Sequence, residues 1–438
     1  MLVLLVVGAL GPSAAVVPLT PGPQNLAPIW PVTLLMWASA AAGGSSLLLG
    51  LAALRRGWRP PARVLLAAGL IGAAALLVVP PLGNGDIGSY AAYGRIAVLG
   101  QSPYTTVPSA LDADPVVAAV EPPWEDQPSV YGPVATASHY AAAALGGESR
   151  EAVLRLLALI AALGFAGVAV GLHRWAPDRG RAHVLWTCNP LLLLHLVAGA
   201  HVDVLLCLPL LLALTGRGRV LRTGLWLAAG CAVKVTGGLS VAALVAARRT
   251  SAVRPVAVAA VTGAALYLAV GGVEALRPVL DARSRVSGGT PWRWVASALE
   301  TVLPNGLARS LVGLGAVVVA IALARTLLRD LPAAEPFLRL SAVLWLAYLL
   351  AAGYQLAWYD AVGFLLLAML GASRWDGLLA VHALALTVAY LPGRVVPLPA
   401  SLDALLPVLR SGLCPAVVLA LWVVALRVRR HADALEPV

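Results

Sequence analysis

Long apolar runs recur along this chain and constrain its fold more than any other feature. A membrane-spanning helix needs about 20 predominantly apolar residues. Of the 438 residues, 60% are hydrophobic and 12% are charged, whereas a soluble globular domain carries about a quarter charged residues. A water-soluble enzyme is therefore excluded. The candidate helices are 2–18, 31–54, 64–80, 153–172, 184–199, 203–215, 223–234, 236–247, 255–271, 306–324, 338–352, 360–372, 378–392 and 411–426.

These runs predict an all-α, polytopic transmembrane protein of about 11 to 14 helices or half-helices. The segments around 203–215, 223–247 and 360–372 are short enough to be half-spanning or tilted. The first segment has no basic residues before it, which favours an uncleaved helix over a signal peptide. Since no internal repeat or soluble domain is evident, we expect residues 1–438 to form a single membrane unit.

The basic residues predict the orientation. The chain has 31 Lys and Arg against 20 Asp and Glu, and its arginines cluster in short loops between apolar runs, as in the cytoplasmic loops of membrane proteins. The excess is therefore interpreted as topology in a multi-pass plasma-membrane protein, and nucleic acid is not expected as a partner. If alternate loops lie on one side, all these clusters fall on the cytoplasmic side: 55–63, 174–181, 217–222, 248–254, 325–339 and 427–430.

Two long segments are then expected on the outer side. Residues 81–133 hold six acidic residues against a single arginine, and residues 272–305 carry Arg283 and Arg285. The positive charge of the second segment departs from the orientation rule and indicates a local role, such as binding an anion. Both segments are expected to carry short amphipathic helices, one of them over 89–99, where Tyr90 and Tyr93 share a face.

Asp86, the helix break with His201 and Asp203, and Lys234 are the candidates for a chemical role. Asp86 stands at the start of the first outer segment, just beyond a helix end. His201 and Asp203 lie in a break between two apolar segments, where ionisable residues are costly unless they face water, a partner or a ligand. The alternatives are a solvated aspartate within an aromatic belt, a helix-capping role for Asp203, and an interfacial histidine bonded to the backbone.

Lys234 is the only lysine, and it lies within an apolar run. A lysine at mid-membrane depth costs about 2.5 to 3.5 kcal/mol. The two glycines at 237 and 238 indicate a bend through which the lysine reaches the outer surface. With Arg283 and Arg285 it would bind an anionic group such as phosphate. The alternative is a lysine that extends to the interface and binds nothing.

Short motifs follow one another along the chain in this order: Gly85-Asp86-Ile87-Gly88-Ser89-Tyr90, Tyr93-Gly94-Arg95, Gly100-Gln101-Ser102-Pro103-Tyr104, Tyr131-Gly132-Pro133, Asn189-Pro190-Leu191, His201-Val202-Asp203 and Lys234. Their order resembles the actinobacterial polyprenol-phosphomannose-dependent α-(1→6)-mannosyltransferases that build lipomannan, which are integral-membrane glycosyltransferases of the GT-C class. The resemblance covers about residues 80 to 240 by motif and the remainder by hydropathy. At the helix break the chain has Val202 where the family has asparagine.

The resemblance implies a donor, an acceptor and a catalytic base, whereas the phosphate-binding and aromatic candidates follow from the chemistry of the residues themselves. The donor is a polyprenyl-phosphate mannose, the acceptor is a glycan or glycolipid hydroxyl, and the α-1,6 product forms with inversion. Asp86 is the implied base, and Lys234, Arg283 and Arg285 would bind the donor phosphate. Since phosphate is a good leaving group, one carboxylate suffices, and no cofactor or metal site is expected, although a divalent-metal requirement stays open. The candidate substrate contacts are Tyr90, Tyr104, Tyr131, His201, Asp203, Trp358 and Tyr359.

Two alternatives remain open on the sequence. A transferase of another polyprenyl-phosphate sugar, such as arabinose or glucose, or a protein mannosyltransferase would use the same residues. A lipid or sugar transporter would place its ionisable residues at mid-membrane depth in paired broken helices. The convergence of Asp86, His201 and the arginine segment on one face favours an enzyme.

Overall fold

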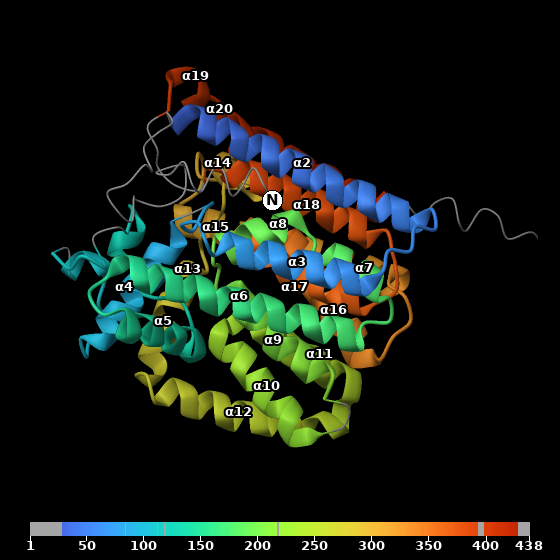
Figure 1. The fold of residues 1–438 in the computed structure, drawn as a ribbon, viewed down its shortest axis with the longest axis horizontal. Coiled ribbons are helices and arrows are strands. Elements are labelled where there is room, and N and C mark those ends of the chain that lie inside the picture. The colour runs from blue at the N-terminus through green and yellow to red at the C-terminus, as the bar shows by residue number, and fades with distance from the viewer. Residues whose placement is uncertain are drawn as a thin grey trace, which may run out of the picture.

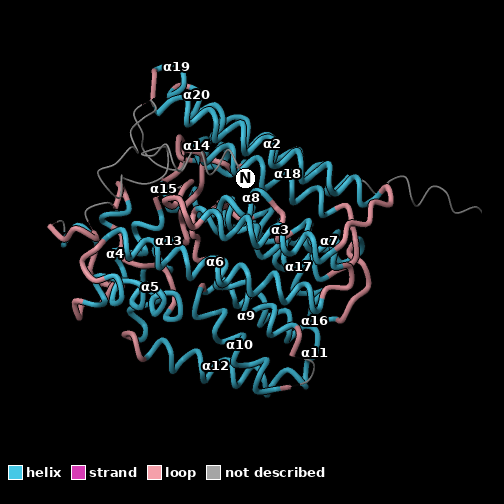
Figure 2. The backbone as a smooth tube through the Cα atoms, in the orientation of Figure 1, coloured by secondary structure: helices cyan, strands magenta, loops and turns pink. Residues whose placement is uncertain are grey.

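The computed structural model describes residues 29–83, 85–111, 113–117, 120–216, 219–392 and 398–427. All the regular structure in these ranges is helical (Figure 2). The expected helix at 2–18 lies outside them, as do Arg217, Arg429 and Arg430. An all-helical fold is the outcome that the apolar runs predict, because only a helix satisfies its own backbone hydrogen bonds within one apolar segment.

The described helices include five that are long and apolar enough to cross a membrane: Trp30–Arg55, Arg150–Trp175, Thr250–Leu268, Asn305–Asp330 and Ala400–Arg427. A sixth span is a bent pair, Pro190–Ala198 with Asp203–Leu214, whose axes differ by 111°. Six shorter apolar helices complete the bundle: Ala62–Leu76, Val220–Val233, Val235–Arg248, Pro336–Ala351, Ala357–Met369 and Trp375–Tyr390. Together they give twelve apolar segments in the described part of the chain, consistent with a polytopic helical membrane protein.

The helices carry the following bounds in chain order: α2 Ile29–Arg55, α3 Ala62–Leu76, α4 Asp86–Val98, α5 Pro133–Gly146, α6 Arg150–Trp175, α7 Arg179–Leu185, α8 Pro190–Leu192, η4 Leu193–Ala198, α9 Asp203–Leu214, α10 Val220–Val233, α11 Gly238–Arg248, α12 Val253–Leu268, α13 Arg277–Ala282, α14 Pro291–Leu299, α15 Asn305–Asp330, α16 Pro336–Ala351, α17 Asp360–Met369, α18 Trp375–Tyr390, α19 Ala400–Asp403, α20 Leu405–Pro407, η9 Val408–Leu413 and α21 Cys414–Arg427. Short 3-10 turns lie between some of them, at Pro108–Leu111, Trp124–Asp126, Val235–Gly237, Arg249–Ala252, Gly272–Leu276 and Ala357–Tyr359.

The bundle has two chemically different ends. In Figure 1, α4, α5 and α13 lie at its left-hand end, and the connection from α2 to α3 lies at its right-hand end. We call these the Asp86 end and the arginine end. The arginine end gathers loops that the sequence assigns to one side, and hydrogen bonds and ion pairs join them: Arg55 to the Ser373 carbonyl, Arg181 to Asp376, Arg248 to Glu335 and Arg374 to Asp330.

The structure differs from a plain reading of the apolar runs at three places. The run 184–199 is interrupted at Asn189, which precedes Pro190: α7 ends at Leu185, and Asn189 starts a new helix by accepting hydrogen bonds from the amides of Leu191 and Leu192 at 3.0 and 3.4 Å. The helix predicted over 89–99 begins at Asp86 and is buried on nearly all sides rather than lying on a surface. Helix α5 was not anticipated, and it covers α4.

An amphipathic helix does occur in the segment 272–305. Helix α14 buries Trp292 and Ala296 and exposes Trp294. Helix α4 differs because alanine and glycine on several of its faces allow neighbouring helices to pack closely around it. The described part of the segment 81–133 is therefore a packed layer, which holds Asp86 in a defined position.

Candidate active site

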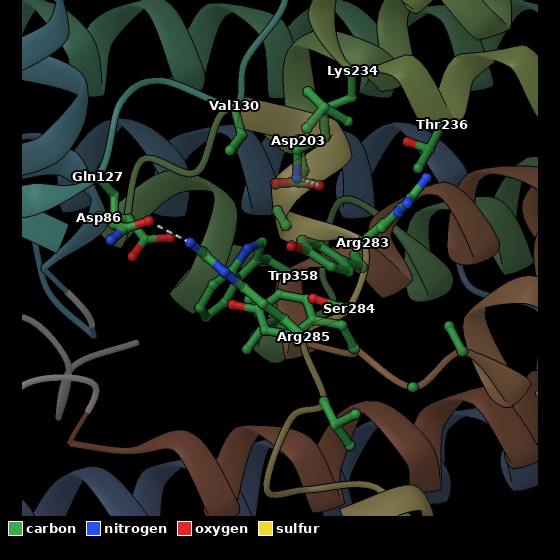
Figure 3. Close-up of a pocket in the computed structure, with 18 of the residues that line it drawn as sticks. Asp86, Gln127, Val130, Asp203, Lys234, Thr236, Arg283, Ser284, Arg285 and Trp358 are labelled. Carbon is green, nitrogen blue, oxygen red and sulfur yellow. Dashed lines mark hydrogen bonds and ion pairs between the residues drawn. The ribbon is translucent and has the colours of Figure 1, made fainter. Parts of the chain in front are cut away.

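A cavity of about 900 Å³ opens at the Asp86 end of the bundle. Its wall combines side chains from both long segments, 81–133 and 272–305, with residues from α9, α15 and α16. Figure 3 shows Asp86 and Lys234 on different elements around this space, with Asp203 beside Lys234 and the Arg285 side chain extending toward Gln127. Ionisable side chains far apart in the sequence thus share one chamber with an apolar wall.

Asp86 is the first residue of α4, and its side chain is 23% exposed. Its Oδ2 atom lies 3.7 Å from His201 Nδ1. Burial raises the pKa of Asp86 to about 7; the Lys234 ammonium opposes this rise, and the Asp203 carboxylate adds to it. A carboxylate of this kind is a stronger base than an ordinary aspartate.

Two glycines in the segment 81–133 allow the close packing that positions Asp86 and Tyr131. A Cβ atom at Gly94 would lie 2.2 Å from the His139 carbonyl oxygen of α5, so only glycine permits this approach of α4 to α5. A Cβ atom at Gly132 would lie 2.3 Å from the Ala232 carbonyl oxygen. The Gly132 amide donates to the Val233 carbonyl at 3.0 Å, which fixes Tyr131 beside the end of α10.

The predicted helix break at 199–203 is present. It separates η4 from α9, and Ala200 there has a φ of +50°, in the left-handed region that favours glycine. The N-cap position of α9 is Val202, and Asp203 is the first helical residue. The interpretation of Asp203 as a capping residue is therefore wrong, because its carboxylate binds Lys234 instead.

Lys234 and Asp203 form an ion pair at the edge of the cavity. The Lys234 Nζ atom donates to Asp203 Oδ1 at 2.7 Å, and the side chains are 15% and 3% exposed. Nζ also lies 4.2 Å from the ring centroid of Tyr359 and 5.7 Å from that of Tyr131, which are cation–π contacts. Asp203 Oδ2 has no hydrogen-bond partner among the described residues. Lys234 thus has a carboxylate and two aromatic rings around it and still lines the cavity.

The bend predicted after Lys234 follows from one close contact. A 3-10 turn, Val235–Gly237, separates α10 from α11. A Cβ atom at Gly237 would lie 2.8 Å from the backbone of Gly230 and Cys231. Only glycine at 237 therefore allows the chain to fold back on the end of α10, so that Lys234 lies at the turn.

The two predicted arginines both line the cavity but differ in their contacts. Arg285 Nη2 donates to Gln127 Oε1 at 2.6 Å, and its guanidinium lies 5.2 Å from the Trp124 ring centroid. These contacts join the two long segments across the cavity, as Figure 3 shows for Arg285 and Gln127. Arg283 is exposed and also lines the cavity.

Trp358 and Tyr359 line the cavity as well. The imidazole of His201 stacks on Trp358 with centroids 3.7 Å apart and an angle of 15°. Tyr359 supports the Lys234 ammonium. His201 thus covers one face of the Trp358 ring, and the sugar contact predicted for Trp358 would have to use the part of the ring that His201 leaves open.

Three of the predicted substrate contacts do not line the cavity. Tyr104 is buried, and its hydroxyl shares a hydrogen bond of 2.8 Å with Thr136 Oγ1. Tyr90 and His201 are also buried behind Asp86, and the Tyr90 hydroxyl lies 3.2 Å from His201 Nδ1. The structure thus brings Asp86, Asp203 and Lys234 to one cavity with Arg283, Arg285, Tyr131, Trp358 and Tyr359.

The cavity also has an apolar wall and a polar rim that the sequence pattern does not reveal. The wall consists of residues one helical turn apart on α15, including Val312, Ala316 and Ala320, together with Trp345 of α16. Trp124 and Gln127 belong to the rim. The spacing of the small apolar residues on α15 was visible, but an ordinary lipid-facing helix has the same pattern. Among the described residues, no group of three or more His, Cys, Asp or Glu side chains is arranged to hold a metal ion.

Comparison with known proteins adds an independent finding. Residues 2–250 match the family model described as alpha-(1->6)-mannopyranosyltransferase, N-terminal domain. The chain is similar to a probable alpha-(1->6)-mannopyranosyltransferase of Mycolicibacterium smegmatis, at 41% identity over 30% of this chain and 24% of that protein. It is also similar to alpha-(1->6)-mannopyranosyltransferase B of Corynebacterium glutamicum, at 32% identity over 38% of this chain and 29% of that protein.

A third relative is alpha-(1->6)-mannopyranosyltransferase A of Mycobacterium tuberculosis, at 30% identity over 39% of this chain and 34% of that protein. The chain therefore matches about a quarter to a third of the length of these curated relatives. The family match includes Asp86, the helix break and Lys234, whereas Arg283, Arg285, Trp358 and Tyr359 lie beyond residue 250.

Proposed function

Because this chain belongs to the alpha-(1->6)-mannopyranosyltransferase family, we propose that it transfers a mannosyl residue from a polyprenyl-phosphate donor to a hydroxyl of a glycan or glycolipid. The product linkage is α-1,6. The relatives' names state a mannopyranosyltransferase activity. The donor and the acceptor are those that the family resemblance implies, and the composition of the cavity supports them. We place the reaction on the outer face of the plasma membrane, since the arginine-rich loops gather at the opposite end of the bundle.

The observation that carries the proposal is the composition of the cavity. It combines a carboxylate whose pKa is raised to about 7, an ammonium group and an apolar wall. A lipid-linked sugar phosphate needs all three, because it has an acceptor proton to lose, an anionic leaving group and a hydrocarbon chain. The small residues of α15 leave room for that chain, and α15 is largely exposed along its length.

In the proposed reaction Asp86 accepts the proton of the acceptor hydroxyl. The hydroxyl oxygen forms a bond to the anomeric carbon as the bond from that carbon to the phosphate oxygen breaks. The bonding electrons leave with the phosphate, and the polyprenyl phosphate departs as an anion. A single displacement of this kind inverts a β-linked donor to an α product.

Cations stabilise the departing phosphate. Lys234 has three N–H donors, of which one binds Asp203, so others are free to bind a phosphate oxygen. Arg283 and Arg285 bring guanidinium groups to the same cavity from the second outer segment. Their charge becomes more effective as the sugar and lipid displace water from the cavity.

The test is transfer by the purified full chain in lipid nanodiscs. We expect radiolabel to move from polyprenyl-phosphate [¹⁴C]mannose to an α-1,6-linked mannooligosaccharide acceptor, with an α linkage in the product. Polyprenyl-phosphate glucose and arabinose serve as competing donors. Transfer from one of those alone would replace mannose by that sugar. With the chain reconstituted in sealed vesicles, movement of intact donor across the membrane without sugar transfer would favour a transporter.

The matched variants are Asp86→Asn and Asp126→Asn. Loss of the base should lower turnover by about 10² to 10⁴ with little change in donor binding. Asp126 is an exposed carboxylate of the same segment that bonds Ser109 and does not line the cavity, so its variant should retain the wild-type rate. Near-normal turnover in Asp86→Asn would remove Asp86 from the mechanism.

A further inference from the structure

A buried histidine joins the two ends of the turn that carries Trp358 and Tyr359. His382 of α18 places Nδ1 2.8 Å from Asp360 Oδ2 and Nε2 3.0 Å from Gln355 Oε1. The three side chains are at most 2% exposed, and none of them lines the cavity. We call this set, Gln355, Asp360 and His382, the His382 clip.

The clip encloses a short segment with direct access to the cavity. Between Gln355 and Asp360 lie only four residues, 356–359. Trp358 stacks on His201, and Tyr359 lies under the Lys234 ammonium. Since one imidazole holds both ends of the turn, the positions of these two rings depend on His382.

A second set of hydrogen bonds extends the clip to the segment with the arginines. The Gln355 amide donates to Ser287 Oγ at 3.0 Å, and the Ser287 amide donates to the Gly353 carbonyl at 2.9 Å. Thr290 Oγ1 also donates to the Gly353 carbonyl, at 3.2 Å. Ser287 lies two residues after Arg285, so these bonds hold the base of the loop that carries its guanidinium.

The His382 clip contributes less to the stability of the bundle than apolar side chains in its place would. Asp360 Oδ1 and Gln355 Nε2 have no hydrogen-bond partner among the described residues. A buried polar network with unsatisfied atoms adds less stability than apolar side chains of similar volume. Its geometry, in contrast, is specific, because each hydrogen bond sets both a distance and a direction.

We propose that the His382 clip is a positioning device that aligns Trp358, Tyr359 and the Arg285 loop around the donor. The effect on transfer rests on the proposed function, whereas the ordering of the two segments does not. Misplacement of positioning groups by about 1 Å lowers turnover by as much as 10²-fold. The clip residues act through their neighbours and do not touch the reacting atoms.

The test compares Gln355→Leu and Asp360→Leu with the conservative variant Asp360→Asn. Both leucine variants cut the clip without leaving an unpaired carboxylate, whereas asparagine keeps an oxygen for His382 Nδ1. Thr187→Val is the matched control. It removes a buried hydrogen bond of 2.8 Å to His183 Nδ1, away from the cavity lining.

Hydrogen–deuterium exchange and steady-state kinetics are measured on the full chain in nanodiscs. We expect faster exchange over 353–360 and 284–290 in both leucine variants, and a kcat lower by about 10-fold to 100-fold with a smaller change in KM. Asp360→Asn should lie within about threefold of the wild-type kcat, and Thr187→Val should match the wild type over both segments.

Two results would contradict the positioning role proposed for the His382 clip. One is unchanged exchange over 353–360 in both leucine variants, and the other is faster exchange with a wild-type kcat. A wild-type protein that transfers no sugar from any donor tested would overturn the proposed function instead, and the exchange data would still decide whether His382 orders these segments.

Discussion

At the scale of single residues, Asp86 and Lys234 have opposite surroundings within one cavity. Asp86 has burial and a neighbouring carboxylate that disfavour its charge, whereas Lys234 has a carboxylate and two aromatic rings around its ammonium group. The first arrangement strengthens a base, and the second keeps a cation in an apolar setting. This division agrees with the roles proposed for the two side chains.

The raised pKa of Asp86 predicts two pH dependences of opposite sign. Turnover requires the ionised carboxylate, so the rate should rise about tenfold per pH unit below pH 7 and level off above it. Stability should change in the other direction, because the folded protein holds this proton more tightly than the unfolded chain. Between about pH 4 and pH 7 this group's contribution to stability is lost as the pH rises.

Asp86→Asn is the control for the stability prediction. The melting temperature, measured from pH 4.5 to pH 8, should fall more with rising pH in the wild type than in this variant. Identical curves for the two proteins would show that Asp86 has an ordinary pKa. A rate profile that is flat between pH 5.5 and pH 7 would give the same answer from kinetics.

The Lys234–Asp203 ion pair predicts a rescue. Lys234→Met leaves the buried Asp203 carboxylate without its partner, which should cost about 3 to 5 kcal/mol of stability. Lys234→Met combined with Asp203→Asn should recover most of it. Donor affinity in the double variant should remain about 10-fold to 100-fold below the wild type, as expected for loss of a hydrogen bond to a charged group.

The measurements are thermal unfolding in detergent and donor binding by the two variants and the wild type. Wild-type donor affinity in the double variant would show that Lys234 serves only the ion pair. Failure of Asp203→Asn to restore stability would show that the lysine has another partner.

At the scale of elements, the site depends on close backbone contacts between short helices and loops. Gly94 allows α4 to approach α5, Gly132 joins the first outer segment to the end of α10, and Gly237 turns the chain after Lys234. The helix break after η4 then directs Asp203 at Lys234. Each contact brings a functional side chain nearer to the cavity.

Gly132→Ala tests this dependence. The new Cβ atom would lie 2.3 Å from the Ala232 carbonyl oxygen, so the loop and α10 must move apart and carry Tyr131 away from Lys234. We expect a kcat lower by about tenfold or more and a loss of stability of about 1 to 3 kcal/mol.

Gly238→Ala is the matched control, because a Cβ atom there meets nothing within 4 Å. It should keep the wild-type kcat, and its free energy of unfolding should lie within about 1 kcal/mol of the wild type. Kinetics and thermal unfolding of both variants check the prediction. Equal effects of the two substitutions would contradict the role assigned to the Gly132 contact.

At the scale of the whole molecule, charge separates the two ends of the bundle. The arginine end contains the loops joined by the Arg181–Asp376 and Arg374–Asp330 ion pairs, and the cavity lies at the Asp86 end. The positive-inside rule then predicts that the arginine end faces the cytoplasm. The donor's sugar and phosphate would enter from the outer face.

Cysteine labelling tests this orientation. Ser109 belongs to the first outer segment and Ala372 to the arginine end, and both residues are exposed. In right-side-out cells a membrane-impermeant thiol reagent should label Ser109→Cys and leave Ala372→Cys unlabelled. The background has the four native cysteines replaced by serine or alanine. The reverse pattern would place the cavity on the cytoplasmic side.

The sequence by itself determined the helical class, most apolar segments, the grouping of arginine loops, and the identity of Asp86, His201, Asp203 and Lys234 as unusual residues. These features are local, since hydropathy and the cost of a charge in an apolar run depend on neighbours in the chain. The family resemblance that joined these residues also rests on local motifs.

Only the tertiary structure decided which of these residues meet. It paired Lys234 with Asp203 across 31 residues, and Arg285 with Gln127 across 158 residues. It also directed Tyr104 to Thr136 and away from the cavity. Such partners are set by helix packing between segments that lie far apart in the chain. The apolar pattern of one segment does not identify its neighbours, because a lipid-facing helix and a buried helix can have the same pattern.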